Sequence, residues 1–391
     1  MKNNVANYYD LMTFGLGNAT FQQFVDMFQN KYNALQVDGF DWDAEIQLDY
    51  TYEQLITSLN IATLPVYVDE ASEGLDKSFG KFEIGSNRIP TQKHRYPISA
   101  KMMREQLLMV QKFGEAALTS QTRDALRNLL FDSTDKLLAG NRNALTHQRM
   151  KIASTGQFTI DLENNPRGLK GLTFDFGVTN KESLSGTSRW WTNAEHTPAN
   201  EGSASDPILY LKNKRKAMKK EGYPNGHFEM SVDLFDDLLT HSKVLQRIGY
   251  SLYPNASSEA NAKSYAENLT DDAKKAAIER LVGAPIVTRD SMAAVEKFDA
   301  GLGGLTINHI ENFKSTNVSF IPDGQIGTIK SVQPIVFQDD PTMRTAWFDG
   351  GRTLLTQRFE SKTRTMYVES EMAVLCVPNM PQYMQIYTVT V

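Results

Sequence analysis

Cysteine is almost absent from the 391-residue sequence, which has only Cys376. A single cysteine excludes a disulfide framework and a zinc site built from several cysteines. It stands in the apolar run 373–377, which favours a buried small side chain over a reactive thiol. No stretch approaches the roughly 18 apolar residues of a membrane span, and the first residues lack the apolar core of a signal peptide. We expect a soluble protein of a reducing cytoplasm, with no membrane partner.

Motifs of enzymatic chemistry are also missing. None of the six histidines has another four residues away, as a helical metal-binding pair requires, and no phosphate-binding loop or Gly-x-Ser-x-Gly elbow occurs. The run Gly301-Leu302-Gly303-Gly304 lacks the third glycine of a dinucleotide loop and a helix after it. We therefore predict no catalytic residue, no metal and no cofactor.

Charge of one sign is not in excess, since 41 Lys and Arg stand against 46 Asp and Glu. This balance argues against a protein held to nucleic acid by clustered positive charge, so any contact with DNA is expected to be weak and non-specific. One basic cluster lies between Lys212 and Lys220, and a solvated helix face explains it better than an anion site.

What the sequence does contain is the composition of a globular protein, with 41% hydrophobic and 22% charged residues. The length favours two or three hydrophobic cores. Changes of pattern along the chain predict five segments. These are an aromatic arm over 1–62, an extended loop over 63–98, a long helix with strands over 99–180, a compact α+β unit over 181–330, and returning strands over 331–391.

Local periodicity refines these segments. Phe21, Phe24 and Phe28 recur with helical spacing, and a second short helix is expected over 52–59. The stripe of Leu and Met from 99 to 151 predicts a long helix with a break at 119–122.

Beyond this helix, alternation predicts a hairpin over 158–176. Helical patterns dominate 206–297. Short strands are expected over 284–287, 305–307, 318–321 and 326–329, and the tail returns to strands over 365–368, 372–377 and 383–391.

The arm and the loop carry apolar residues for which their own segments offer little cover. We expect these side chains to pack on something outside their own segments. They are Phe21, Phe24, Phe28, Leu75, Phe79, Phe82 and Ile84.

Three stretches are similar to a known family. Residues 206–235 resemble its entry to the axial domain, 162–177 resemble the hairpin after its spine helix, and Phe320-Ile321-Pro322-Asp323-Gly324 resembles its late strand and turn. With the order of segments, these identify the chain as similar to major capsid proteins of tailed phages, which have the HK97-type fold. Among them it most resembles the branch of the lambda head protein E.

The resemblance implies an α+β, HK97-like fold with an N-terminal arm, an extended loop, a peripheral domain with a spine helix, and an axial domain. It also implies a function: self-assembly into hexamers and pentamers that form an icosahedral head around double-stranded DNA. The expected partners are other copies of the chain, a scaffold, a portal and, in some relatives, a decoration protein. For a shell subunit, the seven apolar residues of the arm and the loop named above are expected to stay uncovered in a single subunit and to make contacts between copies.

Two other interpretations stay open. One is an α+β enzyme whose site is assembled from scattered residues such as Trp190, His196 and Glu201. The other is the shell of a cellular, encapsulin-like nanocompartment with the same fold.

Overall fold

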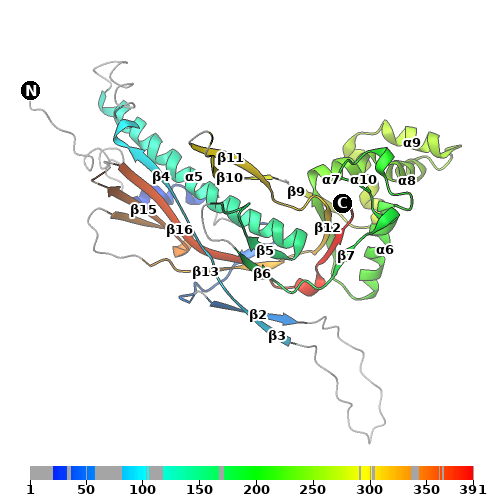
Figure 1. Cartoon of the computed structure of the whole chain (residues 1–391), viewed down its shortest axis with the longest axis horizontal. Helices are drawn as coiled ribbons and strands as arrows, with labels where there is room; N and C mark the ends of the chain where they lie inside the picture. The colour runs from blue at the N-terminus through cyan, green and yellow to red at the C-terminus, as the bar shows by residue number, and fades with distance from the viewer. Residues whose placement is uncertain are drawn as a thin grey trace, which may run out of the picture. The chain divides into compact units, whose positions relative to one another are not determined.

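The computed structural model describes residues 21–32, 37–49, 51–57, 82–102, 104, 118–166, 171–289, 292–299, 301, 304–335, 343–360, 362 and 365–390 (Figure 1). The chain divides into two compact units. Unit 1 comprises 1–52, 86–146 and 328–377, and unit 2 comprises 53–85, 147–327 and 378–391.

Unit 1 is built on a six-stranded sheet of order β1-β13-β16-β15-β14, with β4 also paired to β16. Its strands are β1 (Phe40–Trp42), β4 (Thr91–Ser99), β13 (Gly327–Val332), β14 (Met343–Phe348), β15 (Thr353–Glu360) and β16 (Thr365–Pro378). The second half of β16 is buried on both faces, and the prediction for Cys376 is confirmed because this cysteine is free and buried there.

The long helix α5 (Leu118–Thr155) has 38 residues and no interruption, so the predicted break at 119–122 is wrong. Gly140 lies inside this continuous helix. A Cβ atom at Gly140 would lie 2.7 Å from the His94 ring of β4, so glycine is there because a strand passes close by. The Asn141 side chain joins α5 to two neighbouring strands: it accepts from His94 Nε2 of β4 at 2.9 Å and donates to Ser370 Oγ of β16 at 2.8 Å.

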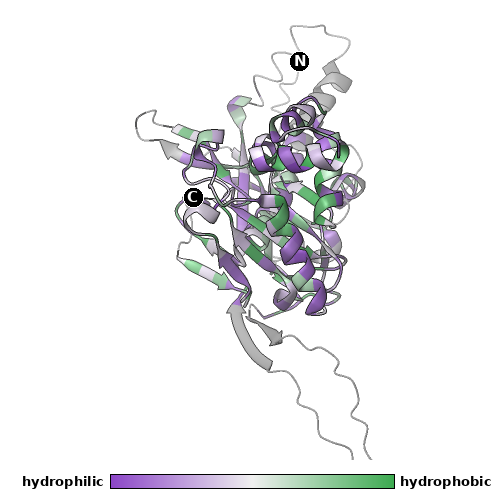
Figure 2. Ribbon diagram, turned by 90° about the vertical axis from the view of Figure 1, so that its right-hand side faces the viewer, coloured by the Kyte–Doolittle hydropathy of each residue, from purple (hydrophilic) through white to green (hydrophobic). Residues whose placement is uncertain are grey.

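Unit 2 contains a five-stranded sheet of order β7-β17-β12-β8-β9 and a group of helices. Its strands are β7 (Lys181–Ser183), β8 (Gly226–Ser231), β9 (Ile286–Arg289), β12 (Asn317–Pro322) and β17 (Gln385–Thr388). Its α-helices are α6 (Pro207–Lys220), α7 (Val232–Thr240), α8 (Ser242–Leu252), α9 (Glu259–Glu267) and α10 (Asp271–Val282). Hydrophilic and hydrophobic residues alternate along these helices, as one-sided packing requires (Figure 2).

Local sequence explains where the helices of unit 2 begin. The side chains of Asp206, Ser231 and Thr270 each accept from a backbone N–H of the following first turn, at the starts of α6, α7 and α10. The buried core between sheet and helices includes Phe228 and Phe320, whose rings meet edge to face at 5.4 Å.

A buried carboxylate, Glu229, holds the end of α5 to the sheet of unit 2. Arg149 donates to both of its oxygens, at 2.5 and 2.6 Å, and Arg289 and His227 donate as well. Although burial opposes the charged form, the nearby Arg149 and the hydrogen bonds hold the pKa of Glu229 well below its usual range. A fully bonded, charged pair of this kind is costly to break.

Three pairs of strands form two-stranded sheets of their own. They are β2 (Thr51–Thr57) with β3 (Phe82–Arg88), β5 (Gln157–Ile160) with β6 (Leu172–Asp175), and β10 (Met292–Asp299) with β11 (Gly304–Glu311). The remaining short helices are α2 (Phe21–Asp26), α3 (Gln29–Tyr32), and the 3-10 helices Gly186–Ser188, Pro198–Asn200, Asp349–Gly351 and Pro381–Tyr383.

The α+β class is confirmed, and the described residues contain the predicted long helix and the hairpin that follows it. Several details differ. Residues 52–57 are not helical, because they belong to β2, which pairs with β3. Within 206–297, the strand expected over 284–287 overlaps β9, whereas β10 stands where helical patterns were predicted. The last strand, β17, pairs with β7 and β12 of unit 2, so 378–391 does not return with the strands before it.

Candidate functional site

The phenylalanines of the N-terminal arm are covered within the chain itself. Phe21, Phe24 and Phe28 are 5%, 3% and 1% exposed. Their rings pack on one another, Phe21 and Phe24 stacked at 6.3 Å, and Phe24 and Phe28 edge to face at 5.5 Å. The expectation that these side chains stay uncovered in a single subunit is therefore wrong.

The edge strand β14 explains this cover, since α2 packs beside it. The Gln22 amide accepts from the Trp347 N–H at 2.7 Å and donates to the Trp347 carbonyl at 2.7 Å. A glutamine side chain thus satisfies the two backbone groups that another strand would otherwise take, and the helix covers the edge.

A second attachment joins the arm to α5. Asp135 accepts from Tyr32 Oη at 2.7 Å and pairs with Lys31 Nζ at 2.5 Å. Burial opposes ionisation of Asp135, but these two hydrogen bonds outweigh it and lower the pKa of its carboxyl. Residues 21–32 of the arm are consequently part of the folded unit 1.

The other predicted contact residues lie in the extended loop. Leu75 and Phe79 fall outside the described residues. Phe82 and Ile84 belong to β3, whose backbone the structure describes. Their role in contacts between copies stays a prediction.

Exposed apolar side chains gather instead on the two-stranded sheet of β10 and β11, here called the ribbon. Met292, Leu305 and Ile307 are 58%, 52% and 70% exposed. Sequence analysis predicted a strand over 305–307, which lies within β11, but placed most of β10 among helical patterns and did not predict a contact surface here.

The residues of the predicted alternative enzyme site do come together, around Trp191. His196 stacks on Trp191 at 4.5 Å, and its two nitrogens reach Asp237 Oδ2 at 2.6 Å and Thr390 Oγ1 at 3.0 Å. Asp237, His196 and Thr390 thus supply a carboxylate, an imidazole and a hydroxyl, joined in that order at the hydrogen-bond distances of a catalytic triad. Thr390, however, is 1% exposed, and its hydroxyl also faces the Trp191 carbonyl, so no substrate reaches it.

The other two residues of that alternative are structural as well. Glu201 Oε1 accepts from the backbone N–H of Ser242 at 2.7 Å, at the start of α8. Trp190 is fully buried and its backbone N–H donates to the Val389 carbonyl at 2.8 Å. The contact of Trp190 with Val389 holds the last part of the chain within unit 2.

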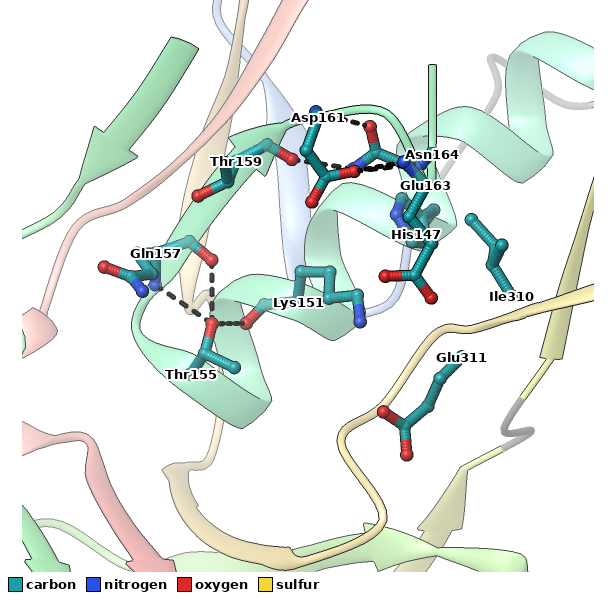
Figure 3. Close-up of a pocket in the computed structure, with 10 residues that line it drawn as sticks. All are labelled: His147, Lys151, Thr155, Gln157, Thr159, Asp161, Glu163, Asn164, Ile310 and Glu311. Atoms are coloured by element: carbon teal, nitrogen blue, oxygen red, sulfur yellow. Dashed lines mark hydrogen bonds between the residues drawn. The ribbon is translucent and has the colours of Figure 1, made fainter. Parts of the chain in front are cut away.

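A pocket of about 140 Å³ lies in unit 2 between the end of α5, the β5–β6 turn and the end of β11 (Figure 3). Its polar groups serve the local fold: Thr155 Oγ1 donates to the Lys151 carbonyl, and Asp161 accepts from two N–H groups of its own turn. His147 Nδ1 donates to Asn312 Oδ1 at 2.6 Å, and burial lowers the pKa of this histidine. The pocket holds no nucleophile paired with a base.

Two further tests concern the described part of the chain. There, no three His, Cys, Asp or Glu side chains gather as metal ligands would. Within the same ranges, every helix is too short or too polar to span a bilayer.

Comparison with solved structures finds capsids. The chain is similar to the capsid of cyanophage A-1(L), with a TM-score of 0.44, 10% identity and coverage of 99% of both chains. It is similar to the capsid of cyanophage P-SCSP1u, with a TM-score of 0.43, 11% identity and coverage of 90% and 87%. A third similar structure is the capsid of Myoviridae phage XM1, with a TM-score of 0.43, 9% identity and coverage of 90% and 89%. No protein-family model and no curated protein matches the sequence.

Proposed function

We propose that the chain is the major capsid protein of a tailed bacteriophage. Copies assemble into hexamers and pentamers, and these close into the icosahedral head that encloses double-stranded DNA. The observation that carries this proposal is the order of elements. An anchored arm and a two-stranded loop precede one 38-residue helix, which leads into a helical unit before the chain returns to a six-stranded sheet.

The physical reason to expect assembly is that a single copy leaves strand edges and apolar side chains exposed. A two-stranded sheet is marginal in water unless it gains a neighbour, and among the described residues both β2–β3 and β10–β11 pair with no further strand. Exposed large apolar residues on the β10–β11 ribbon add to this. A shell supplies such neighbours, because each copy presents different surfaces to the copies beside it and rotation closes the ring.

Within the tailed-phage capsid proteins, the stretch 206–235 and the late strand and turn at 320–324 favour the branch of the lambda head protein E. The segments 1–62, 63–98, 99–180, 181–330 and 331–391 would then act as arm, extended loop, peripheral domain, axial domain and returning strands. Scaffold, portal and decoration proteins are the further partners this proposal implies, and the virion is the location.

An enzyme is the weaker interpretation, because Thr390, which supplies the hydroxyl of the triad-like group, is only 1% exposed. A cellular nanocompartment shell differs in cargo and not in subunit chemistry. Particles isolated from the producing cell distinguish the two, since a phage head contains double-stranded DNA and a nanocompartment contains protein.

The direct test is the assembly state of the purified full chain, by light scattering and negative-stain electron microscopy. We expect capsomers or closed shells, and a monodisperse monomer or dimer at all concentrations would contradict the proposal. A paired variant, Leu75→Ser with Phe79→Ser, keeps the length of the loop. It is expected to retain the circular dichroism of the parent while losing shells, and normal shell yield would show that these two residues are not contacts.

A further inference from the structure

Helix α6 concentrates positive charge within unit 2. Its 14 residues include five lysines and one arginine, and none of them is acidic. Because the whole chain has a formal net charge of −5, the residues outside α6 are together more negative than the chain as a whole. The helix therefore carries the opposite sign of charge to the rest of the protein.

Four of these lysines lie on one exposed face of α6. They follow one another after four, three and one positions, which gathers them on one side of a helix with about 3.6 residues per turn. The opposite side is buried through Ile208, Leu211 and Met218, and Figure 1 shows α6 at the margin of unit 2. We call the exposed set the lysine stripe: Lys212, Lys216, Lys219 and Lys220.

In the part of the chain that the structure describes, no acidic side chain pairs with the lysine stripe. The other two cations of α6 do have partners. Lys214 pairs with Glu182. Arg215 is buried, donates to Asn225 Oδ1 at 3.0 Å and lies over the Phe320 ring. The fold thus uses these two cations and leaves the stripe to solvent.

The lysine stripe destabilises the helix that carries it. Lys216 is four residues from both Lys212 and Lys220, and like charges at this separation repel one another on a helix. The helix dipole favours Lys219 and Lys220 in the last turn, but its effect does not extend to Lys212 and Lys216. A solvated face, which the sequence alone favours, requires polar residues and not four charges of one sign.

A polyanion of regular charge is the partner that this surface fits. The stripe presents four cations along about 12 Å of helix axis. Double-stranded DNA carries one negative charge per about 1.7 Å of its own axis. Protein–protein interfaces are depleted in lysine and enriched in aromatic residues and arginine, and the stripe has neither. Lysine is a compact, hydrated charge on a flexible stem, which suits contact with phosphates whatever the base sequence.

We propose that the lysine stripe of α6 contacts the phosphate backbone of the double-stranded DNA that the shell encloses. The inference rests on the proposed function, because that function supplies the DNA, and it names the surface that meets it. The stripe then faces the interior of the shell. With only four cations, the contact is weak and independent of base sequence. An acidic protein partner is an outcome of the test below.

Binding of a short double-stranded DNA of mixed sequence to the unassembled full chain, measured by fluorescence anisotropy over a range of salt concentrations, tests this contact. The test variant combines Lys212→Gln, Lys216→Gln, Lys219→Gln and Lys220→Gln. The matched control has the same net charge, because it changes four exposed lysines of four other segments. It combines Lys136→Gln, Lys243→Gln, Lys297→Gln and Lys314→Gln.

Glutamine is a good helix former, so both variants are expected to keep the circular dichroism of the parent. A third variant, with arginine at the four positions of the stripe, keeps the charge and is expected to bind DNA as the parent does. If it fails to bind while it stays folded, a property of the lysines other than charge is responsible, and the inference is overturned.

The measured quantity is the slope of the logarithm of the binding constant against the logarithm of the salt concentration. We expect the test variant to reduce the magnitude of this slope by about 3 to 4, since each phosphate contact contributes about 0.9, and the control to change it by less than about 1. Equal slopes in the two variants, or a parent chain that does not bind the DNA, would overturn the inference.

Polyglutamate in place of DNA tests the acidic protein partner. If the parent binds polyglutamate more tightly than DNA, and the test variant loses this binding, the stripe belongs to an acidic protein segment and the inference is wrong. Electron microscopy of the same chains at assembly concentration shows whether particles form. Particles with equal slopes in the two variants contradict only the contact with DNA, whereas absence of any particle from the parent contradicts the proposed function.

Discussion

The N-terminal arm and the β10–β11 ribbon are both short, apolar additions to a sheet-based unit, but they differ in where their apolar side chains lie. In the arm, Phe28 is 1% exposed because an edge strand and α5 lie beside it. In the ribbon, Ile307 is 70% exposed, and in the described part of the chain β10 and β11 pair only with each other. Apolar content alone therefore does not identify a contact surface, and the elements that flank a segment decide whether it is covered.

The largest difference between the two regions is expected on removing Phe28. Phe28→Ala should weaken docking of the arm by about 3–5 kcal/mol, because a fully buried ring leaves a cavity. Limited proteolysis should then cut the arm while the rest of unit 1 stays folded. Met27→Ala is the matched control, since Met27 is 58% exposed and its loss should change stability by less than about 0.5 kcal/mol. If the arm of Phe28→Ala resists proteolysis and the variant loses only assembly, the original expectation that Phe28 contacts another copy would be restored.

A second prediction concerns the turn after β14, the strand that the arm covers. Asp349 is 3% exposed, its φ is 56°, and burial raises its pKa to about 6 despite the nearby Arg352. The folded state binds this proton more tightly than the unfolded chain, so stability is greatest below pH 4 and falls as the pH rises from about 4 to 6.

Asp349→Asn removes the buried charge and keeps a residue that tolerates positive φ. We expect the variant to be more stable than the parent above pH 6 by about 2 kcal/mol, and to show no gain at pH 4. Thermal unfolding at both pH values measures this. An equal gain at both would mean that backbone strain, and not the carboxylate, sets the cost.

The smallest effect on folding is expected in the ribbon. Ile307→Ser should change the free energy of unfolding by less than about 0.5 kcal/mol, because the side chain is already mostly in water. Its expected effect is on association, where the concentration needed for assembly should rise by about tenfold. A loss of stability comparable to that of Phe28→Ala would place Ile307 in the core and remove the contrast between the two regions.

The sequence predicts regular elements well where period and neighbours agree. The hairpin over 158–176 is found as β5 and β6, with Phe158 opposite Phe174, because both strands alternate and a turn joins them. The α2 helix follows from the spacing of its phenylalanines. Their burial could not be predicted, since the covering strand β14 lies more than 300 residues further along the chain.

Only one strand of the ribbon was predicted, over 305–307 in β11, although the sequence carries a signal for both strands. Alternating residues flank the glycines at 301, 303 and 304, which is the pattern of a hairpin. We interpreted these glycines only as an incomplete nucleotide loop. The buried Glu229 could not be found from sequence either, because Arg149, Arg289 and His227 reach it from three different elements.

Hydrogen exchange of the full chain, compared before and after assembly, tests the central claim most directly. The account predicts that amides of 292–311 exchange more slowly in the assembled state, because a second copy covers the ribbon, while amides of 21–32 change little, since the arm is already docked. Slower exchange in the arm together with an unchanged ribbon would contradict it.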